Sequence, residues 1–84
     1  MYSIIFKTPA KKFLKKLDKI TAKKIIDRIE SLKKLPKQGK PLSGNLRGLW
    51  RLRVDKYRII YQIKNNELIV YVLAIGHRKN IYSN

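Results

Sequence analysis

The sequence predicts an α+β fold in which a helical hairpin packs on an antiparallel, four-stranded, twisted sheet. Two observations predict it: apolar residues recur at helical spacing in the first half of the chain, and runs of aromatic and β-branched residues fill the second half. A chain of 84 residues supports one core, because a second domain would leave neither half enough interior to offset its conformational entropy. We therefore expect a single domain over residues 1–84.

The first half of the chain predicts one strand followed by two helices. Residues 3–6 are a short apolar run typical of a strand, and Thr8 with Pro9 is a typical helix start, with Thr8 as the cap. Thr21 is the expected cap of the second helix, and Pro36 ends the helical pair. The two apolar stripes consist of Ala10, Phe13, Leu14 and Leu17, and of Ala22, Ile25, Ile26, Ile29 and Leu32.

The second half predicts a loop and three further strands. Residues 36–48 are rich in proline and glycine, as loops are. The strands are expected over residues 49–54, 57–63 and 68–75, with short turns at 55–56 and 65–66. The last strand contains no polar residue, which is typical of a central strand buried on both faces.

The charge of the chain points to a polyanionic partner. With 21 Lys and Arg against 5 Asp and Glu, the net charge is +16, well above what a small domain needs to stay soluble. Lysines dominate the first half and supply diffuse attraction, whereas most arginines lie in the second half and can grip a phosphate with two hydrogen bonds. The candidate nucleic-acid contacts outside the arginine-rich strands are Lys11, Lys12, Lys15, Lys16 and Arg47.

The acidic residues and the absence of cysteine argue against two kinds of catalytic site, one built on a thiolate and one built on a divalent metal ion. Without cysteine there is no thiolate nucleophile and no disulfide framework. The five carboxylates, on Asp18, Asp27, Glu30, Asp55 and Glu67, are scattered and form no paired site for a divalent ion. We therefore expect no metal and no cofactor. The chain also contains no secretory segment and no stretch long enough to span a bilayer, so we expect no membrane partner and a cytoplasmic location.

Three arginines are expected on one face of the sheet. Alternation over residues 50–54 puts Arg51 and Arg53 on the face opposite the core, and a two-residue turn at 55–56 places Arg58 across from Arg53. Two facing like charges cost a few tenths to about 1 kcal/mol, and a phosphate between them would reverse the sign. Long arginines can also simply extend into solvent. The same face carries Ile60, Ile69, Tyr71 and Leu73, which predicts a docking surface for another protein or for a second layer of this chain.

The last residues add groups that the strands lack. His77 is the only histidine of the chain, and Arg78 and Tyr82 follow within a few residues. Histidine is the side chain most suited to proton transfer near neutral pH. A lone histidine is nevertheless more often structural than catalytic, and a C-terminal tyrosine is more often a packing residue. By themselves these residues are a weak signal.

Four segments match the pattern of one known family in residue type and order. They are residues 42–54 (LSGNLRGLWRLRV), 57–62 (YRIIYQ), 75–78 (IGHR) and 81–82 (IY). Through them the chain resembles the RelE/ParE toxin superfamily, most closely the RelE-type ribonucleases, along almost its whole length. The resemblance implies a helical hairpin packed on an antiparallel sheet, in agreement with the reading of the residues themselves.

The resemblance also implies a function and a site. It implies the toxin of a type II toxin–antitoxin system, a metal-independent endoribonuclease that cleaves messenger RNA on the ribosome by turning the RNA's 2′-hydroxyl onto the adjacent phosphate. By position, Arg51, Arg53 and Arg58 would hold the phosphate, Arg78 would assist the leaving oxygen and Tyr82 would act as the base. The positions of Arg51 and Arg53 are lysines in the best-known branch, and that of His77 is not histidine there. His77 is therefore a second candidate for a proton transfer.

Two other functions remain open at this point. ParE-like members of the same superfamily inhibit DNA gyrase and need no nuclease site, and composition alone equally supports a non-catalytic RNA- or ribosome-binding module. The terminal block of His77, Arg78 and Tyr82 favours the nuclease. For either toxin we expect an acidic antitoxin whose amphipathic segment covers the apolar part of the arginine face, with a heterotetramer as one possible assembly.

Overall fold

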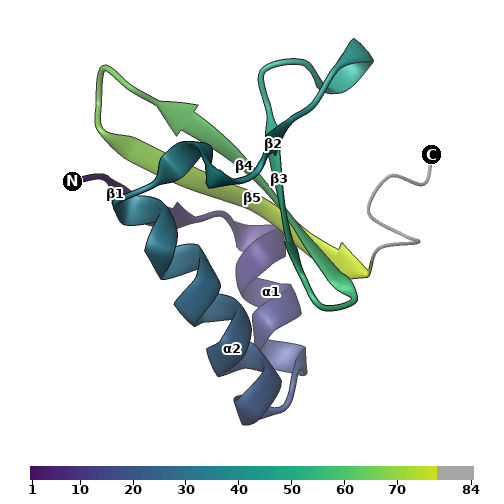
Figure 1. Cartoon of the computed structure of the whole chain (residues 1–84). Coiled ribbons are helices and arrows are strands. Elements are labelled where there is room, and N and C mark those ends of the chain that lie inside the picture. The colour runs from purple at the N-terminus through teal and green to yellow at the C-terminus, as the bar shows by residue number, and fades with distance from the viewer. Residues whose placement is uncertain (78–84) are drawn as a thin grey trace.

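The architecture is α+β, as the sequence predicts: two helices pack on one face of a single sheet (Figure 1). The structure is a computed structural model and describes residues 1–77. The regular elements are β1 (Ser3–Phe6), α1 (Thr8–Lys16), α2 (Lys19–Glu30), β2 (Lys40–Pro41), β3 (Trp50–Val54), β4 (Tyr57–Lys64) and β5 (Ile69–His77), with short 3-10 turns at Ser31–Lys33, Pro36–Gln38 and Gly44–Leu46. Within residues 1–77, no helix has the length and apolar character needed to cross a membrane.

Within residues 1–77 the sheet has five strands rather than the four expected. Their order is β1-β5-β4-β3-β2, with β1 parallel to β5 and the other neighbours antiparallel. The additional strand, β2, holds only Lys40 and Pro41, which pair with Arg51 and Trp50. Two residues are too few to show an alternating pattern, so sequence reading assigned them to the loop. The parallel direction of β1 is likewise not encoded in its apolar pattern.

The helical hairpin covers the inner face of the sheet, and the core lies between them. Its fully buried helical residues belong to the two stripes expected from the sequence, and they meet Val70 and Val72 of β5 in one cluster; they are Ala10, Ile25, Ile29 and Leu32. The outer face of β5 is only half-buried, so this strand is interior to the sheet but is not buried on both faces. Among residues 1–77, the two helices cover only one face of the sheet.

Both expected helix caps are wrong by a few residues. Thr8 is the first residue of α1, and Lys7 holds the cap position. The cap of α2 is Asp18, whose carboxylate accepts a hydrogen bond from the main-chain nitrogen of Thr21 at 3.0 Å. This bond holds the pKa of the Asp18 carboxyl below its ordinary value, because it stabilises the ionised form. Asp18 and Thr21 are both good cap residues, and only the packing of the helix decides between them.

A buried tyrosine fixes the start of the long loop against the sheet. The Tyr61 hydroxyl accepts a hydrogen bond from the nitrogen of Gly39 at 3.1 Å and donates one to the oxygen of Pro36 at 2.7 Å. A side chain at Gly39 would place its Cβ 2.4 Å from the Arg51 oxygen and 2.7 Å from the Tyr61 hydroxyl, so only glycine permits this approach. Burial raises the pKa of Tyr61. The loop thus enters β2 at a fixed position beside β3.

Candidate nucleic-acid interface

The β3–β4 hairpin has the register expected from the sequence. Arg53 pairs with Arg58, and Arg51 pairs with Ile60. The turn residue Asp55 has a φ of 55°, a left-handed conformation that aspartate tolerates better than most residues. Its carboxylate also forms a 2.7 Å ion pair with Lys24 of α2, which ties the turn to the helical layer. Arg51, Arg53 and Arg58, the arginine trio, therefore share the outer face of the sheet.

The two facing arginines are close neighbours. A two-residue turn closes on a hydrogen-bonded pair, so the next pair out, Arg53 with Arg58, is of the non-hydrogen-bonded kind, with Cα atoms about 4.5 Å apart. The Arg53 side chain is exposed, whereas Arg58 and Arg51 are half-buried. The Nε atom of Arg51 is buried and has no hydrogen-bond acceptor within residues 1–77. An acceptor supplied by a ligand would relieve the desolvation of this group.

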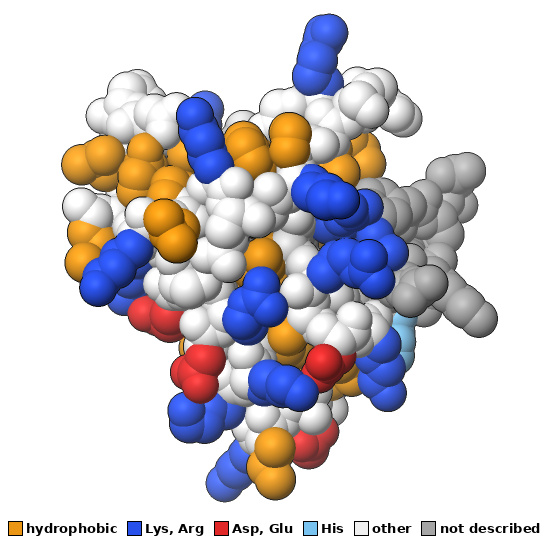
Figure 2. Space-filling model, viewed as in Figure 1, with side chains coloured by type: hydrophobic (Ala, Val, Ile, Leu, Met, Phe, Trp, Pro, Cys, Tyr) orange, Lys and Arg blue, Asp and Glu red, His pale blue; other side chains and the backbone are white. Residues whose placement is uncertain are grey.

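Within residues 1–77, no acidic side chain forms an ion pair with Arg51 or Arg53. The three ion pairs found within these residues use Lys23, Lys24 and Lys33. The five carboxylates bond instead as follows: Asp18 to Thr21, Asp27 to Lys23, Glu30 to Lys33, Asp55 to Lys24 and Glu67 to Tyr71. In Figure 2, Lys and Arg side chains gather at the upper right of the view, and the acidic side chains lie in its lower half.

A bulge in β5 decides which residues share the arginine face. Tyr61 pairs with Val72 but Ile60 pairs with Ala74, so Leu73 has no partner on β4. Ile60, Ile69 and Tyr71 lie on the arginine face as expected, because they pair with Arg51, Lys64 and Gln62. Beyond the bulge the alternation has shifted by one residue.

The shift places His77 on the other face of the sheet. Gly76 now lies opposite Arg58, and His77 pairs with Tyr57, whose side chain points to the core. The His77 ring is exposed and lies 5.0 Å from the Tyr57 ring, centroid to centroid. The structure therefore does not bring the His77 side chain onto the face of the arginine trio. Arg78 and Tyr82, the other expected catalytic residues, lie outside the described residues 1–77.

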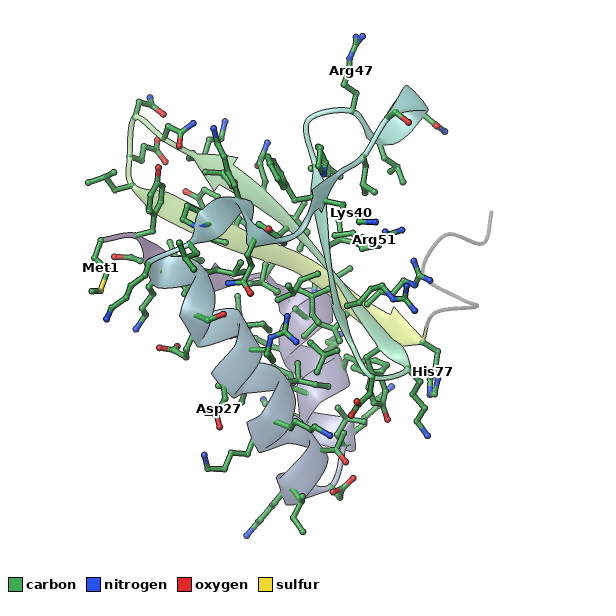
Figure 3. The ribbon with its side chains drawn as sticks, viewed as in Figure 1. Met1, Asp27, Lys40, Arg47, Arg51 and His77 are labelled. Carbon is green, nitrogen blue, oxygen red and sulfur yellow. The ribbon has the colours of Figure 1, made fainter. Side chains whose placement is uncertain are left out.

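The other expected RNA-binding residues are not gathered with the trio. Lys11, Lys12, Lys15 and Lys16 are exposed on α1, which belongs to the helical layer on the opposite face of the sheet. Arg47 is exposed in the loop before β3 and points away from Arg51 (Figure 3).

Two cations that sequence reasoning missed lie beside Arg51 and Arg53. Lys40 pairs with Arg51 across β2 and β3 and so shares its face (Figure 3). Arg28, from the last turn of α2, lines a pocket of about 220 Å³ at the same edge of the sheet. This edge pocket is lined by Arg28, Gln38, Gly39, Lys40, Arg51, Leu52 and Arg53. No sequence pattern connects Arg28 with Lys40, because they belong to different elements, α2 and β2, that meet only in the folded chain.

A helical hairpin on one face of a small five-stranded sheet, with three arginines on the other face, defines a small basic α+β domain. Comparison with known proteins gives the family. The model of the ParE toxin of type II toxin–antitoxin systems, parDE, matches residues 4–82. The chain therefore belongs to the ParE toxin family, within the RelE/ParE superfamily, and is the toxin of a type II toxin–antitoxin system.

Known toxins are similar to this chain in sequence and in structure. Toxin RelG of Mycobacterium tuberculosis is 34% identical over 83 residues, which cover 96% of this chain and 95% of that protein. The toxin–antitoxin complex RelBE2 of the same organism contains a chain with a TM-score of 0.84 and 30% identity, covering 92% of this chain and 98% of the other. The isolated E. coli RelE toxin shares the fold, with a TM-score of 0.77 and 19% identity over 98% of this chain and 92% of its own.

Proposed function

We propose that this toxin is a metal-independent endoribonuclease that cleaves messenger RNA on the ribosome and so arrests translation. The observation that carries the proposal is the arginine trio. Arg53 pairs with Arg58 across β3 and β4 on the outer face of the sheet, and Arg51 keeps a buried Nε without an acceptor from residues 1–77. A buried guanidinium nitrogen without an acceptor costs desolvation energy, and a phosphate bound at the trio would supply an acceptor and offset the repulsion between the facing charges.

The proposed reaction uses the RNA as its own nucleophile. The 2′-oxygen bonds to the adjacent phosphorus, the bond from phosphorus to the 5′-oxygen breaks, and the products are a 2′,3′-cyclic phosphate and a free 5′-hydroxyl. The trio stabilises the additional negative charge of the pentacoordinate phosphorus, since arginine stays charged and its donors are already oriented. Tyr82 takes the proton from the 2′-hydroxyl, and Arg78 stabilises the leaving oxygen. His77 returns a proton to that oxygen, which requires the RNA to pass round the end of β5.

The chemistry of the products tests the proposal. In a translation extract, we expect cleavage of messenger RNA to leave 2′,3′-cyclic phosphate ends, and a matched message with a 2′-deoxy sugar at the cleaved position to stay intact. A parallel ribosome-free reaction containing EDTA reports whether free RNA is also cut without a divalent metal. Cutting of the deoxy substrate, or loss of activity in EDTA with recovery in Mg²⁺, would contradict this mechanism.

One alternative function has an observation in its favour. The matching family model is named for ParE toxins, and the ParE-like activity is inhibition of DNA gyrase. A gyrase supercoiling assay with the same preparation separates the two. Inhibition of supercoiling without RNA cleavage would replace the nuclease proposal with this one.

We also propose that an acidic antitoxin binds the outer face of the sheet, in a heterotetramer or smaller complex. Relatives have been solved as toxin–antitoxin complexes, and the outer face carries apolar side chains beside the trio. Ile5 pairs with Tyr71 across β1 and β5, and its side chain is 39% exposed. We expect Ile5→Asp to weaken binding of the co-expressed antitoxin without unfolding the toxin. A complex in which the antitoxin contacts only the α1 lysines would contradict this proposal.

A further inference from the structure

The edge pocket is a cationic site distinct from the center of the arginine face. Four of its seven lining residues are Lys or Arg, and none is acidic. It lies where β2 ends and the edge of β3 becomes open. Its fixed wall is the loop start held by Tyr61, together with Gln38, whose side-chain nitrogen donates to Ser31 Oγ at 2.8 Å and to the Leu35 oxygen at 3.3 Å. Hydrogen bonds to Tyr61 of the sheet and to the turns that follow α2 therefore fix this wall of the pocket.

The open edge adds main-chain groups to this site. The nitrogen of Leu42 donates to the oxygen of Leu49 at 2.9 Å, so Leu49 directs its main-chain groups toward β2. Alternate residues of a strand direct their main-chain N–H and C=O groups to the same side. Arg51 and Arg53 therefore direct these groups to the same side as Leu49 does. The pairing of β2 reaches only as far as Arg51. The main chain of Arg53 consequently faces the open edge, in the pocket that its residue lines.

Arg28 brings a charge from the helical layer to this edge. The acidic residues near it in α2 already have partners, because Asp27 pairs with Lys23 at 2.9 Å and Glu30 pairs with Lys33 at 2.7 Å. Neither ion pair includes Arg28. The pocket therefore collects positive charge from α2, β2 and β3 with no carboxylate among its lining residues.

We propose that the edge pocket binds a second backbone phosphate of the RNA, one that flanks the phosphate held by the trio. This inference rests on the proposed function and extends its substrate site. Arg51 and Arg53 belong to both sites, so a chain with regularly spaced phosphates can occupy the two together. Guanidinium forks and main-chain amides both suit a phosphodiester, and each such contact raises affinity through release of counterions. Arg28 and Lys40 then determine the path of the RNA backbone past the edge of the sheet.

The salt dependence of RNA binding tests the proposal. The probe is a short 2′-O-methyl oligoribonucleotide, which has no free 2′-hydroxyl and so separates binding from cleavage. For Arg28→Gln we expect a several-fold weaker affinity, and a plot of log affinity against log salt whose slope is smaller by about 0.7, the value for one phosphate contact on a single strand. Lys19→Gln is the matched control, because it removes one charge from the exposed other end of α2. Lys40→Gln repeats the test on a separate element.

The outcomes distinguish this inference from the nuclease proposal. Equal affinity and slope for Arg28→Gln and Lys19→Gln would overturn it, whatever the cleavage activity. So would a loss confined to antitoxin binding, which would make an acidic protein the occupant of the pocket. A reduced slope for Arg28→Gln and Lys40→Gln in a protein that does not cut RNA would support the phosphate site and overturn the nuclease.

Discussion

Arg53→Ala is expected to lower RNA cleavage by about 10²–10³-fold, the usual cost of removing one oriented donor from a transition state. The same change is expected to leave the free energy of unfolding unchanged or slightly higher. Its side chain is exposed, and its cross-strand neighbour is Arg58. Removing one of two facing like charges relieves a few tenths to about 1 kcal/mol of repulsion. Loss of activity without loss of stability identifies a residue kept for binding a ligand.

The control for Arg53→Ala is Lys64→Ala. Lys64 is exposed at the other end of the same hairpin and on the same face, so the variant removes an equal charge away from the trio. Thermal melting and the cleavage rate are measured for both. If Arg53→Ala melted several degrees below the wild-type protein, the arginine would be structural and its assignment to the site would fail. Arg58 is less suited to this test, because it is half-buried and truncation also removes packing.

The sequence contains enough information to place the arginine trio but not to place the histidine. The two-residue turn at 55–56 sets the pairing of Arg53 with Arg58, since turn length fixes the register of a hairpin. The all-apolar strand β5 has no such marker. Its bulge at Leu73 shifts the alternation, and without the shift His77 would lie on the face of Arg58. A bulge inside an all-apolar run leaves no polar residue out of phase to reveal it.

The same limit explains what was missed at the edge of the sheet. β2 is two residues long and depends on the contact between Gly39 and Tyr61, which are far apart in the sequence. Lys40 follows Gly39 and pairs with Arg51 on the arginine face, whereas Arg28 reaches the edge pocket from the last turn of α2. Local sequence patterns predict helices and strands and the face on which each residue lies. A site assembled from α2, β2 and β3 depends on tertiary packing instead. Composition predicts a polyanionic partner, but it does not show which surface would bind that partner.

Tyr82→Phe is expected to lower the cleavage rate by about 10²–10⁴-fold, the range for loss of one positioned acid–base group. Affinity for the 2′-O-methyl oligoribonucleotide should stay unchanged, because the aromatic ring is retained and only the hydroxyl is lost. The proposed base is the Tyr82 hydroxyl, which phenylalanine lacks. Single-turnover cleavage, measured beside equilibrium binding, separates the two effects.

Tyr71→Phe is the control for loss of a tyrosine hydroxyl, since Tyr71 lies on the same sheet as the arginine trio and its hydroxyl donates a hydrogen bond to Glu67 near the start of β5. Its cleavage rate should match that of the wild-type protein. His77→Ala then tests how the proton transfers are divided. If His77 returns the proton to the leaving oxygen, the variant loses one limb of the pH–rate profile. Because its ring lies on the face opposite the trio, this result also requires RNA that bends round the end of β5. An undiminished rate in the Tyr82→Phe, His77→Ala double variant would leave the reaction without its proposed base and acid.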